Sequence, residues 1–445
     1  MYAKLMNFLV LGIANSGVSV SKLLLSKGAR VYIYDNSTKE KTQKSVEELV
    51  SLGCVKVDNI DEILNEIDVL VLSPGVSVLN EIAVKAKGQG IRIIGELELA
   101  SYFINNPIVA VTGTNGKTTT CSLISHTLSK NGVNNKLVGN IGTPLSTVVG
   151  QDENDILVVE VSSFQLETTC RFTPHVSCIL NITEDHLERH FTMENYIFLK
   201  SKLILTLKES EFAVLNYDDE QVRNLSLKTK AKIVWISQKE RVDGVYLLGG
   251  EIYSGEEKII SVNDLTIKGS HNIENVLCSV AVLKLLGLTN QEIVNGLTTF
   301  KGVKHRIEEV ASVNGITFYN DSKATNPDAT IKAINSLSGD LVVILGGYDK
   351  GLEYSEMFSQ IALNSNVKGI VLTGQTALKM YEYAKEQGLT NLVISSNFET
   401  AIKLAYAISK ENYKILLSPA TSSFDEFTGY EERGEKFIEI ATSIG

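Results

Sequence analysis

The stretch from Ile108 to Thr120 constrains the fold of this chain most strongly. A β-branched apolar run is followed by Gly113 and Gly116 and then by a lysine and three threonines. This order is typical of a strand–loop–helix unit that binds phosphate, because the glycines let backbone N–H groups converge on phosphate oxygens. The helix N-terminus adds a partial positive charge and Lys117 adds a full one. The sequence therefore predicts a phosphate-binding loop within an α/β sheet.

The loop departs from the pattern G-x-x-x-x-G-K-[ST], because Val111 stands where the first glycine belongs. An ordinary glycine turn would explain the glycines but not the lysine and threonines beside them. A helical pattern is expected from Cys121 onward, and the hydroxyl of Thr118 is a candidate ligand for Mg²⁺. The residues expected to hold nucleotide phosphates are Gly113, Thr114, Asn115, Gly116, Lys117, Thr118 and Thr119.

Composition limits the class of protein. A chain of 445 residues predicts two to four domains, and 44% hydrophobic with 21% charged residues is typical of a soluble globular protein. The net charge of −10 opposes a broad nucleic-acid surface, which needs a basic patch. Five dispersed cysteines without a C-x-x-C pair favour reduced thiols in a cytoplasmic protein. No stretch approaches the roughly 18 apolar residues of a membrane span, so no membrane insertion is expected. The chain is also expected to be a monomer.

The N-terminal region reads as a parallel, doubly wound sheet, because short strands alternate with helices. Its first turn, Gly12–Gly17, and the acidic Asp35 resemble a dinucleotide fingerprint. Ala14 replaces the middle glycine, so a plain α/β turn remains an alternative. The loops at 12–17, 35–36 and 73–76 follow strands and should line one ligand-binding edge.

The central region carries polar residues at the ends of apolar strands. The stretch Ile156–Leu166 reads as one strand holding Glu160, which needs an ion-pair partner or a metal ion because burying an unpaired carboxylate is costly. A later strand leads to His186, and Tyr196 and Lys200 share one helix face.

The last region repeats this arrangement. Strands predicted at 316–319, 341–345, 367–372 and 415–417 each end in a polar loop. The carboxyl ends of parallel strands meet at one edge, so a second α/β domain with its own site-forming edge is expected.

Taken in order, these loops resemble the Mur ligase family over nearly the whole chain. The motifs that carry the resemblance are Thr112–Thr119, Gly139–Gly142, Glu160–Gln165, Asn181–His186, Gly269–Asn272, His305-Arg306, Asn320–Thr325 and Ser418–Ser423. The resemblance implies three domains: a Rossmann-like sheet at 1–94 for a UDP-substrate, a P-loop ATPase-like sheet at 95–302, and a Rossmann-like sheet at 303–445 for an amino acid. Within the family, the chain is most similar to members that add D-glutamate to UDP-N-acetylmuramoyl-L-alanine during peptidoglycan synthesis.

That resemblance implies a mechanism in which ATP phosphorylates the substrate carboxylate and the amine of D-glutamate displaces phosphate. Lys117, His186 and Lys200 would be catalytic. Two Mg²⁺ ions would be held by Thr118, Glu160, His186 and Lys200, with Lys200 carbamylated. Lys202 lies close to Lys200 in the sequence and is the competing candidate for that modification.

The resemblance also implies the ligand contacts. Beyond the phosphate loop, the ATP-binding residues would be Asn272, His305, Arg306 and Asp321. The UDP-substrate would meet Ser16, Asp35, Asn36, Ser73, Gly75, Asn140 and His186. D-glutamate would meet Lys323, Thr325, Lys350, Ser423, Phe424 and Tyr430.

Three other readings of the sequence remain open. A nicotinamide-dependent oxidoreductase would use the first glycine turn, but it leaves Lys117, Glu160 and His186 without a role. A nucleotide-switched binding module would hydrolyse ATP without joining substrates. A related Mur-type ligase would add L-alanine, a diamino acid or further glutamates.

Overall fold

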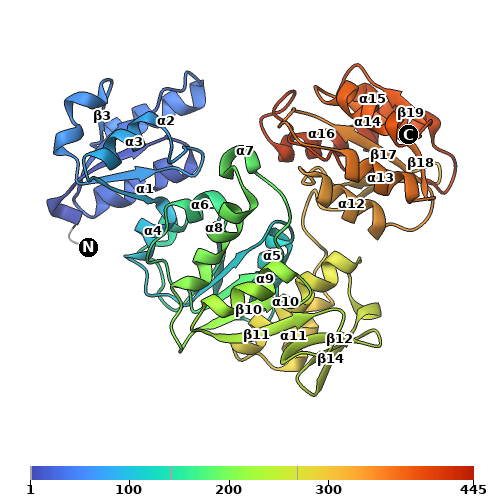
Figure 1. Ribbon diagram of the computed structural model, residues 1–445, viewed down its shortest axis with the longest axis horizontal. Coiled ribbons are helices and arrows are strands. Elements are labelled where there is room, and N and C mark those ends of the chain that lie inside the picture. Colours follow the sequence, from blue (N-terminus) through green and yellow to red (C-terminus); the bar gives the residue numbers. More distant parts are fainter. Residues whose placement is uncertain (1–2, 141–142, 268, 445) are drawn as a thin grey trace. The chain divides into compact units, whose positions relative to one another are not determined.

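The computed structural model describes residues 3–140, 143–267 and 269–444, and these residues form three β-sheets (Figure 1). They divide into two compact units, one of Met1–Leu265 with Glu274–Phe300 and the other of Thr266–Ile273 with Lys301–Gly445. The first unit holds two sheets and the second unit holds the third. The α/β class with three sheets is confirmed, while the domain boundaries expected at 94 and 302 stay predictions.

The N-terminal sheet is parallel, in the order β3-β2-β1-β4-β5. Its two faces have separate apolar cores, and α1 and α2 cover one of them. The strand order reverses between β1 and β4, which is where such sheets bind ligands. The elements are β1 (Asn7–Leu11), β2 (Arg30–Tyr34), β3 (Val55–Lys56), β4 (Val69–Leu72), β5 (Arg92–Gly95), α1 (Asn15–Ser26), α2 (Glu40–Ser51), α3 (Glu81–Gly88) and α4 (Glu96–Ser101).

The central sheet has the order β14-β13-β12-β11-β10-β9-β6-β8-β7 in the described residues. Strands β6 to β12 pair in parallel, and β13 pairs antiparallel with both β12 and β14. Its strands are β6 (Ile108–Thr112), β7 (Asn135–Gly139), β8 (Ile156–Glu160), β9 (Val176–Ile179), β10 (Phe212–Asn216), β11 (Lys232–Ser237), β12 (Gly244–Leu248), β13 (Glu251–Ser254) and β14 (Glu257–Ser261). The helices of this region are α5 (Lys117–Lys130), α6 (Ser163–Glu167), α7 (Leu187–His190), α8 (Met193–Leu205), α9 (Glu220–Leu225), α10 (Ser270–Leu285) and α11 (Asn290–Leu297).

Two boundaries expected in the central region were wrong. Helix α5 begins at Lys117 rather than Cys121, directly after Gly116, whose φ of 89° makes the turn. The strand expected over 156–166 ends at Glu160, and α6 follows, because Ser162 and Gln165 form a reciprocal capping box. The motif expected at 139–142 is described only as far as Asn140, since Ile141 and Gly142 lie outside the described residues.

The C-terminal sheet has the order β15-β16-β20-β17-β18-β19, parallel except for β15. Helices α12 to α14 cover one face, and α15 and α16 cover the other. The polar loops after β16, β20 and β17 are neighbours, because these three strands are adjacent. The elements are β15 (Glu308–Val313), β16 (Ile316–Asn320), β17 (Leu341–Gly346), β18 (Val367–Thr373), β19 (Leu392–Ile394), β20 (Lys414–Leu417), α12 (Pro327–Ser336), α13 (Ser355–Leu363), α14 (Ala377–Glu386), α15 (Phe398–Ile408) and α16 (Tyr430–Ser443).

Two general expectations can also be compared with the structure. All five cysteines are free, as expected, and four of them are buried. Among the helices of the described residues, none combines the length and the apolar character that crossing a membrane requires.

Candidate nucleotide and substrate sites

The predicted phosphate loop connects β6 to α5 and is held by hydrogen bonds to Asn181, which follows β9. The backbone N–H groups of Thr114 and Asn115 donate to the carbonyl and side-chain oxygens of Asn181, at 2.9 Å each. A Cβ at Gly116 would lie 2.2 Å from Oδ1 of Asn275, so this turn requires glycine. The first N–H groups of α5 have no carbonyl one turn earlier within the helix, which is the arrangement that binds anions at helix N-termini.

Two lysines converge on this loop. Lys117 Nζ donates to the carbonyl oxygens of Gly113 and Thr114, and Lys200 Nζ donates to the carbonyl of Gly113, each at 2.8 Å. Both ammonium groups therefore lie at one end of the phosphate loop, although their residues are far apart in the sequence. Such a concentration of positive charge favours a phosphate ligand.

Lys200 is deeply buried, with only 1% of its surface exposed. Burial, together with the nearby charge of Lys117, lowers the pKa of Lys200 well below its usual value, and Asp185 only partly opposes this. Its Nζ lies 4.6 Å from the ring centre of Tyr196, so the expected shared helix face is confirmed. Lys202 points elsewhere, since its Nζ donates to the carbonyls of Leu166 and Glu167. The geometry thus favours Lys200 over Lys202 at the phosphate loop.

Glu160 ends β8 beside the loop and is 2% exposed. Its Oε1 accepts a hydrogen bond of 2.8 Å from the side-chain amide of Asn140. The other carboxylate oxygen, Oε2, is buried and has no hydrogen-bond partner among the residues that the structure describes. β8 pairs with β6 in the register that sets Glu160 opposite Val111, which precedes the last residue of β6. A buried oxygen without a partner next to a phosphate site fits a cation ligand.

His186 stands at the start of α7 in a left-handed conformation, with φ of 56°. Its Nε2 lies 3.6 Å from Asp185 and its Nδ1 lies 3.5 Å from Glu188. Its ring packs against Phe164, with 4.7 Å between centroids. Across the described ranges, no three His, Cys, Asp or Glu side chains gather as a metal-binding group, so Glu160 and His186 are not part of one such cluster.

The N-terminal sheet has a cleft of about 480 Å³ at the carboxyl ends of its strands. Asp35 and Asn36 line it, together with Gly12 and residues at the start of α3. The carboxylate of Asp35 accepts hydrogen bonds from the backbone N–H groups of Ile13, at 2.6 Å, and Ser37, at 2.8 Å. Asp35 therefore fixes the turn at the cleft wall.

The other residues expected around the UDP-substrate are spread along the same edge. Ser73 Oγ donates to the carbonyl of Gly12 at 2.6 Å, which ties the loop after β4 to the loop after β1. Ser16 lies in the first turn of α1, and Gly75 is exposed on the loop after β4. Asn140 is exposed after β7, with its side chain on Glu160. Neither Ser16 nor Gly75 is among the residues that line the cleft.

Three of the remaining residues expected to bind ATP lie next to the first two strands of the C-terminal domain. His305 and Arg306 precede β15, and Asp321 directly follows β16. Asp321 is buried, and its carboxylate accepts hydrogen bonds from Ser418 Oγ, at 2.8 Å, and from Ile307 N–H, at 3.3 Å. Burial raises the pKa of Asp321 to about 7, although the positive charge of Arg306 works in the opposite direction. His305 is buried too, and its Nδ1 lies 2.9 Å from the side-chain nitrogen of Asn320. Arg306, His305 and Asp321 are thus brought together.

Asn272, the fourth such residue, is buried in the first turn of α10. Its backbone N–H donates to the carbonyl of Gly269 at 3.0 Å.

The residues expected to bind the amino acid lie on three neighbouring loops. Lys323 follows β16, Lys350 follows β17 and Ser423 follows β20. Lys323 Nζ lies 3.2 Å from the hydroxyl of Tyr430 and 5.0 Å from its ring centre. Ser423 is buried and Lys350 is half-buried. Thr325 is half-buried near Lys323 in the chain, whereas Phe424 is 66% exposed.

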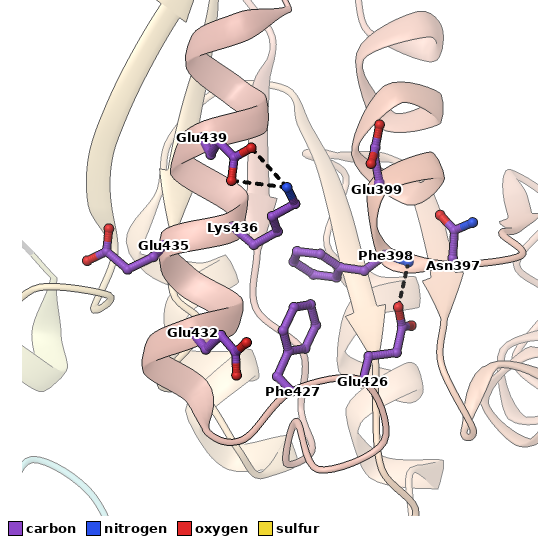
Figure 2. Close-up of a pocket in the computed structure, with 9 residues that line it drawn as sticks. All are labelled: Asn397, Phe398, Glu399, Glu426, Phe427, Glu432, Glu435, Lys436 and Glu439. Carbon is purple, nitrogen blue, oxygen red and sulfur yellow. Dashed lines mark hydrogen bonds and ion pairs between the residues drawn. The ribbon is translucent and has the colours of Figure 1, made fainter.

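A different hollow in this domain, of about 720 Å³, lies between α15 and α16 (Figure 2). The rings of Phe398 and Phe427 meet edge to face there, 5.1 Å apart. Five glutamates and a single lysine, Lys436, are among its lining residues, so its charge would repel an acidic amino acid. None of the residues expected to bind ATP or D-glutamate lines it.

Two residues whose side chains hold other loops through hydrogen bonds were not singled out from the sequence. Asn181 bonds the backbone of the phosphate loop, and Arg433 is buried among the loops after β16 and β20. Asn181 belongs to a motif that the sequence did show, at the end of a buried strand. Nothing in the local sequence distinguishes Arg433 from a surface arginine of α16.

Three α/β sheets with a phosphate loop on the second define a P-loop protein with two flanking α/β domains. Family descriptions match the same succession: the Mur ligase MurD-like N-terminal domain over residues 6–95, the Mur ligase middle domain over 111–283, and the Mur ligase glutamate ligase domain over 305–421. The chain belongs to the Mur ligase family, as the loop motifs predicted.

Individual relatives match at full length. The UDP-N-acetylmuramoylalanine--D-glutamate ligase of Thermoanaerobacter sp. (strain X514) is 42% identical over 450 residues, 98% of each chain. The ligase of the same name from Clostridioides difficile (strain 630) is 40% identical, again over 98% of each chain.

Solved structures share the fold at lower identity. MurF from Acinetobacter baumannii superposes with a TM-score of 0.65 at 20% identity, covering 93% of this chain and 91% of that one. MurF from Thermotoga maritima in complex with ADP gives 0.62 at 16% identity and covers 100% of both chains.

Proposed function

We propose that this chain is an ATP-dependent ligase that joins D-glutamate to UDP-N-acetylmuramoyl-L-alanine in the synthesis of peptidoglycan precursors. The observation that carries the proposal is the full-length similarity to relatives named for this ligation. The convergence of Lys117, Lys200 and Glu160 at the phosphate loop supports it independently, because phosphoryl transfer needs charge neutralisation at one place. The monomeric state expected from the sequence stays a prediction.

The reaction would proceed in two steps. An oxygen of the substrate carboxylate attacks the γ-phosphorus of ATP, ADP leaves, and an acyl phosphate forms. The amine of D-glutamate then attacks the acyl carbon, the carbon–oxygen bond to phosphate breaks, and the nitrogen loses a proton as the amide forms. Lys117 would move from the loop carbonyls to the β- and γ-phosphates and stabilise the charge that develops there.

The residues at the loop fit a bound Mg²⁺ ion. Glu160 offers a buried carboxylate oxygen without a partner, and Thr118 offers a hydroxyl in the first turn of α5. In phosphoryl-transfer sites Mg²⁺ commonly uses one or two carboxylates together with substrate phosphates. The ion would supply neutralisation of the phosphate charge. His186 would hold a second ion.

Lys200 would be carbamylated. A buried lysine with a lowered pKa spends more of its time as the neutral amine, which is the nucleophilic form. The amine nitrogen would form a bond to the carbon of CO₂ and release one proton, leaving a carbamate anion near the phosphate loop. This modification converts a positive side chain into an anionic ligand.

The ligand sites would then follow the three sheets. The UDP group would occupy the cleft beside Asp35 and Asn36. The adenine, ribose and phosphates would meet the ATP-binding residues Asn272, His305, Arg306 and Asp321 as well as the phosphate loop. D-glutamate would meet residues on the three loops of the C-terminal sheet, namely Lys323, Thr325, Lys350, Ser423, Phe424 and Tyr430.

A panel of amino acids tests the proposal. The protein is incubated with UDP-N-acetylmuramoyl-L-alanine, ATP and Mg²⁺ plus D-glutamate, L-alanine or a diamino acid, and new amides are detected by mass. We expect a product with D-glutamate only. A product with another amino acid in its place would identify a different Mur-type ligase, and ADP release without any amide would indicate a nucleotide switch.

A further inference from the structure

Arg433 of α16 is buried, and the acidic charges of Asp425 and Asp321 act on it from beyond ion-pair distance. Its exposed fraction is 2%, and no ion pair of Arg433 occurs within 4.0 Å among the described residues. Its guanidinium instead donates four hydrogen bonds, to Ser322 Oγ at 3.0 Å and to the carbonyls of Ser322, Thr421 and Ser422 at 2.9 to 3.2 Å. A buried cation whose hydrogen bonds all go to neutral oxygen atoms indicates that it holds together the chain segments that carry those oxygens.

The acceptors belong to loops that carry the proposed D-glutamate contacts. Ser322 precedes Lys323 on the loop after β16, and Ser422 precedes Ser423 on the loop after β20. The carbonyl of Ser422 also accepts the backbone N–H of Tyr348 at 2.9 Å, which brings in the loop after β17.

The approach of this third loop is close. A Cβ on Gly347 would lie 2.3 Å from the carbonyl of Ser422 and 3.0 Å from Nη1 of Arg433. Only glycine therefore allows the loop of Lys350 to pack at this distance. One guanidinium thus touches, directly or through Ser422, all three loops of the amino-acid site.

We infer that Arg433 is a positioning residue for the amino-acid subsite, which sets the separation of Lys323, Lys350 and Ser423. This inference rests on the proposed function. A planar guanidinium with five donors in fixed directions can hold several carbonyls at defined spacings, which an ammonium cannot do. The same helix also presents Glu432, Lys436 and Glu439 to the hollow (Figure 2), and Arg433 is not among the residues that line it.

Loss of the Arg433 guanidinium should weaken the binding of D-glutamate and leave the binding of ATP unchanged. Asp321, on the same loop as Ser322, is held by hydrogen bonds from Ser418 and from the backbone of Ile307. Arg433 acts on Asp321 through its charge alone, which lowers the pKa of that carboxyl, and not through either hydrogen bond. Loss of the guanidinium should therefore loosen the D-glutamate contacts while leaving the nucleotide residue in place. Small displacements of positioning groups can cost about 100-fold in rate.

The test compares Arg433→Met and Arg433→Lys with Lys436→Met, a matched control at a half-exposed position of the same helix that lines the hollow. Acyl-phosphate formation is measured without amino acid, by trapping with hydroxylamine, and the KM for D-glutamate is measured in the full reaction. We expect KM to rise by about 10-fold or more in both Arg433 variants. Acyl-phosphate trapping by the two Arg433 variants should stay within about twofold of the parent. For Lys436→Met, both the trapping and the KM for D-glutamate should stay within about twofold of the parent.

Two results would overturn the inference: an unchanged KM for D-glutamate in a folded Arg433 variant, or an equal loss of trapping and ligation. If the Arg433 variants fail to fold by circular dichroism, Ser322→Ala is measured instead, because it removes the acceptor of Nε and leaves the three carbonyls. It also removes the hydrogen bond from Ser322 Oγ to the carbonyl of Tyr430, so only an unchanged KM in this variant is decisive. An unchanged KM in that variant would then refute the role. A parent that forms no amide with D-glutamate would refute the proposed function instead, which is a distinguishable outcome.

Discussion

Replacing Lys200 by methionine should abolish ligation while making the protein more stable. The change removes a buried ammonium whose desolvation costs several kcal/mol, and methionine fills a similar volume. It also removes the hydrogen bond to the carbonyl of Gly113, worth about 0.5–1.5 kcal/mol, but that carbonyl keeps the bond from Lys117. We therefore expect the free energy of unfolding near neutral pH to rise by about 1–3 kcal/mol.

This gain in stability should depend on pH. Because the folded state lowers the pKa of Lys200, the unfolded chain keeps that proton to a higher pH than the folded chain does. Between the two pKa values the unfolded state binds more protons, so the stability of the parent rises with pH. The advantage of Lys200→Met should therefore fade as pH approaches about 10.4, the usual pKa of lysine.

Urea unfolding in buffer purged of CO₂, at about pH 7 and about pH 10, measures both effects while the amine stays unmodified. Lys202→Met is the matched control for activity, because Lys202 lies on the same helix but donates to the carbonyls of Leu166 and Glu167 and not to that of Gly113. The control should keep its ligase activity. A Lys200→Met protein that is less stable than the parent at neutral pH, or whose advantage does not change with pH, would refute the reasoning.

Three further predictions concern the two sites. Lys117→Ala should lower kcat by about 10³-fold, since its charge acts on the transferring phosphoryl group, while binding of the UDP-substrate measured by calorimetry should be unchanged; an equal loss of both would contradict separate sites. Lys350→Ala should raise the KM for D-glutamate with little effect on the KM for ATP, because a dicarboxylate needs a second cation, and an unaltered KM would remove Lys350 from the pocket. Asp321, whose pKa rises to about 7 on folding, binds more protons in the folded state and so makes the parent less stable as pH rises from about 4 to 7. The difference in unfolding free energy between Asp321→Asn and the parent, measured in urea, should therefore favour the variant more at about pH 8 than at about pH 5. A difference of equal size at both pH values would count against the raised pKa.

The parts of the fold that depend on local pattern could be predicted. The phosphate loop and the polar loops after the strands both follow from residues close together in the sequence. The start of α6 was missed because the apolar residues of β8 continue past Glu160. The spacing of Ser162 and Gln165, three residues apart, was the available signal for that helix.

The contacts that join distant segments could not be predicted. Arg433 meets Ser322 across 111 residues, and Lys200 meets Gly113 across 87. Periodicity and turn chemistry report on neighbours within a few residues and carry no information about such pairs. Glu160 illustrates this limit. Its apolar neighbours in the sequence showed that its carboxylate needs a partner, but they did not show that Asn140 is that partner.

The fate of the substrate's carboxylate oxygen tests the proposed chemistry most directly. UDP-N-acetylmuramoyl-L-alanine labelled with ¹⁸O in its terminal carboxylate is incubated with ATP, Mg²⁺ and D-glutamate, and the inorganic phosphate is analysed by mass. An acyl-phosphate route transfers one labelled oxygen to phosphate for every amide formed, and this is the predicted result. Phosphate without ¹⁸O, whether or not ADP is released, would contradict it.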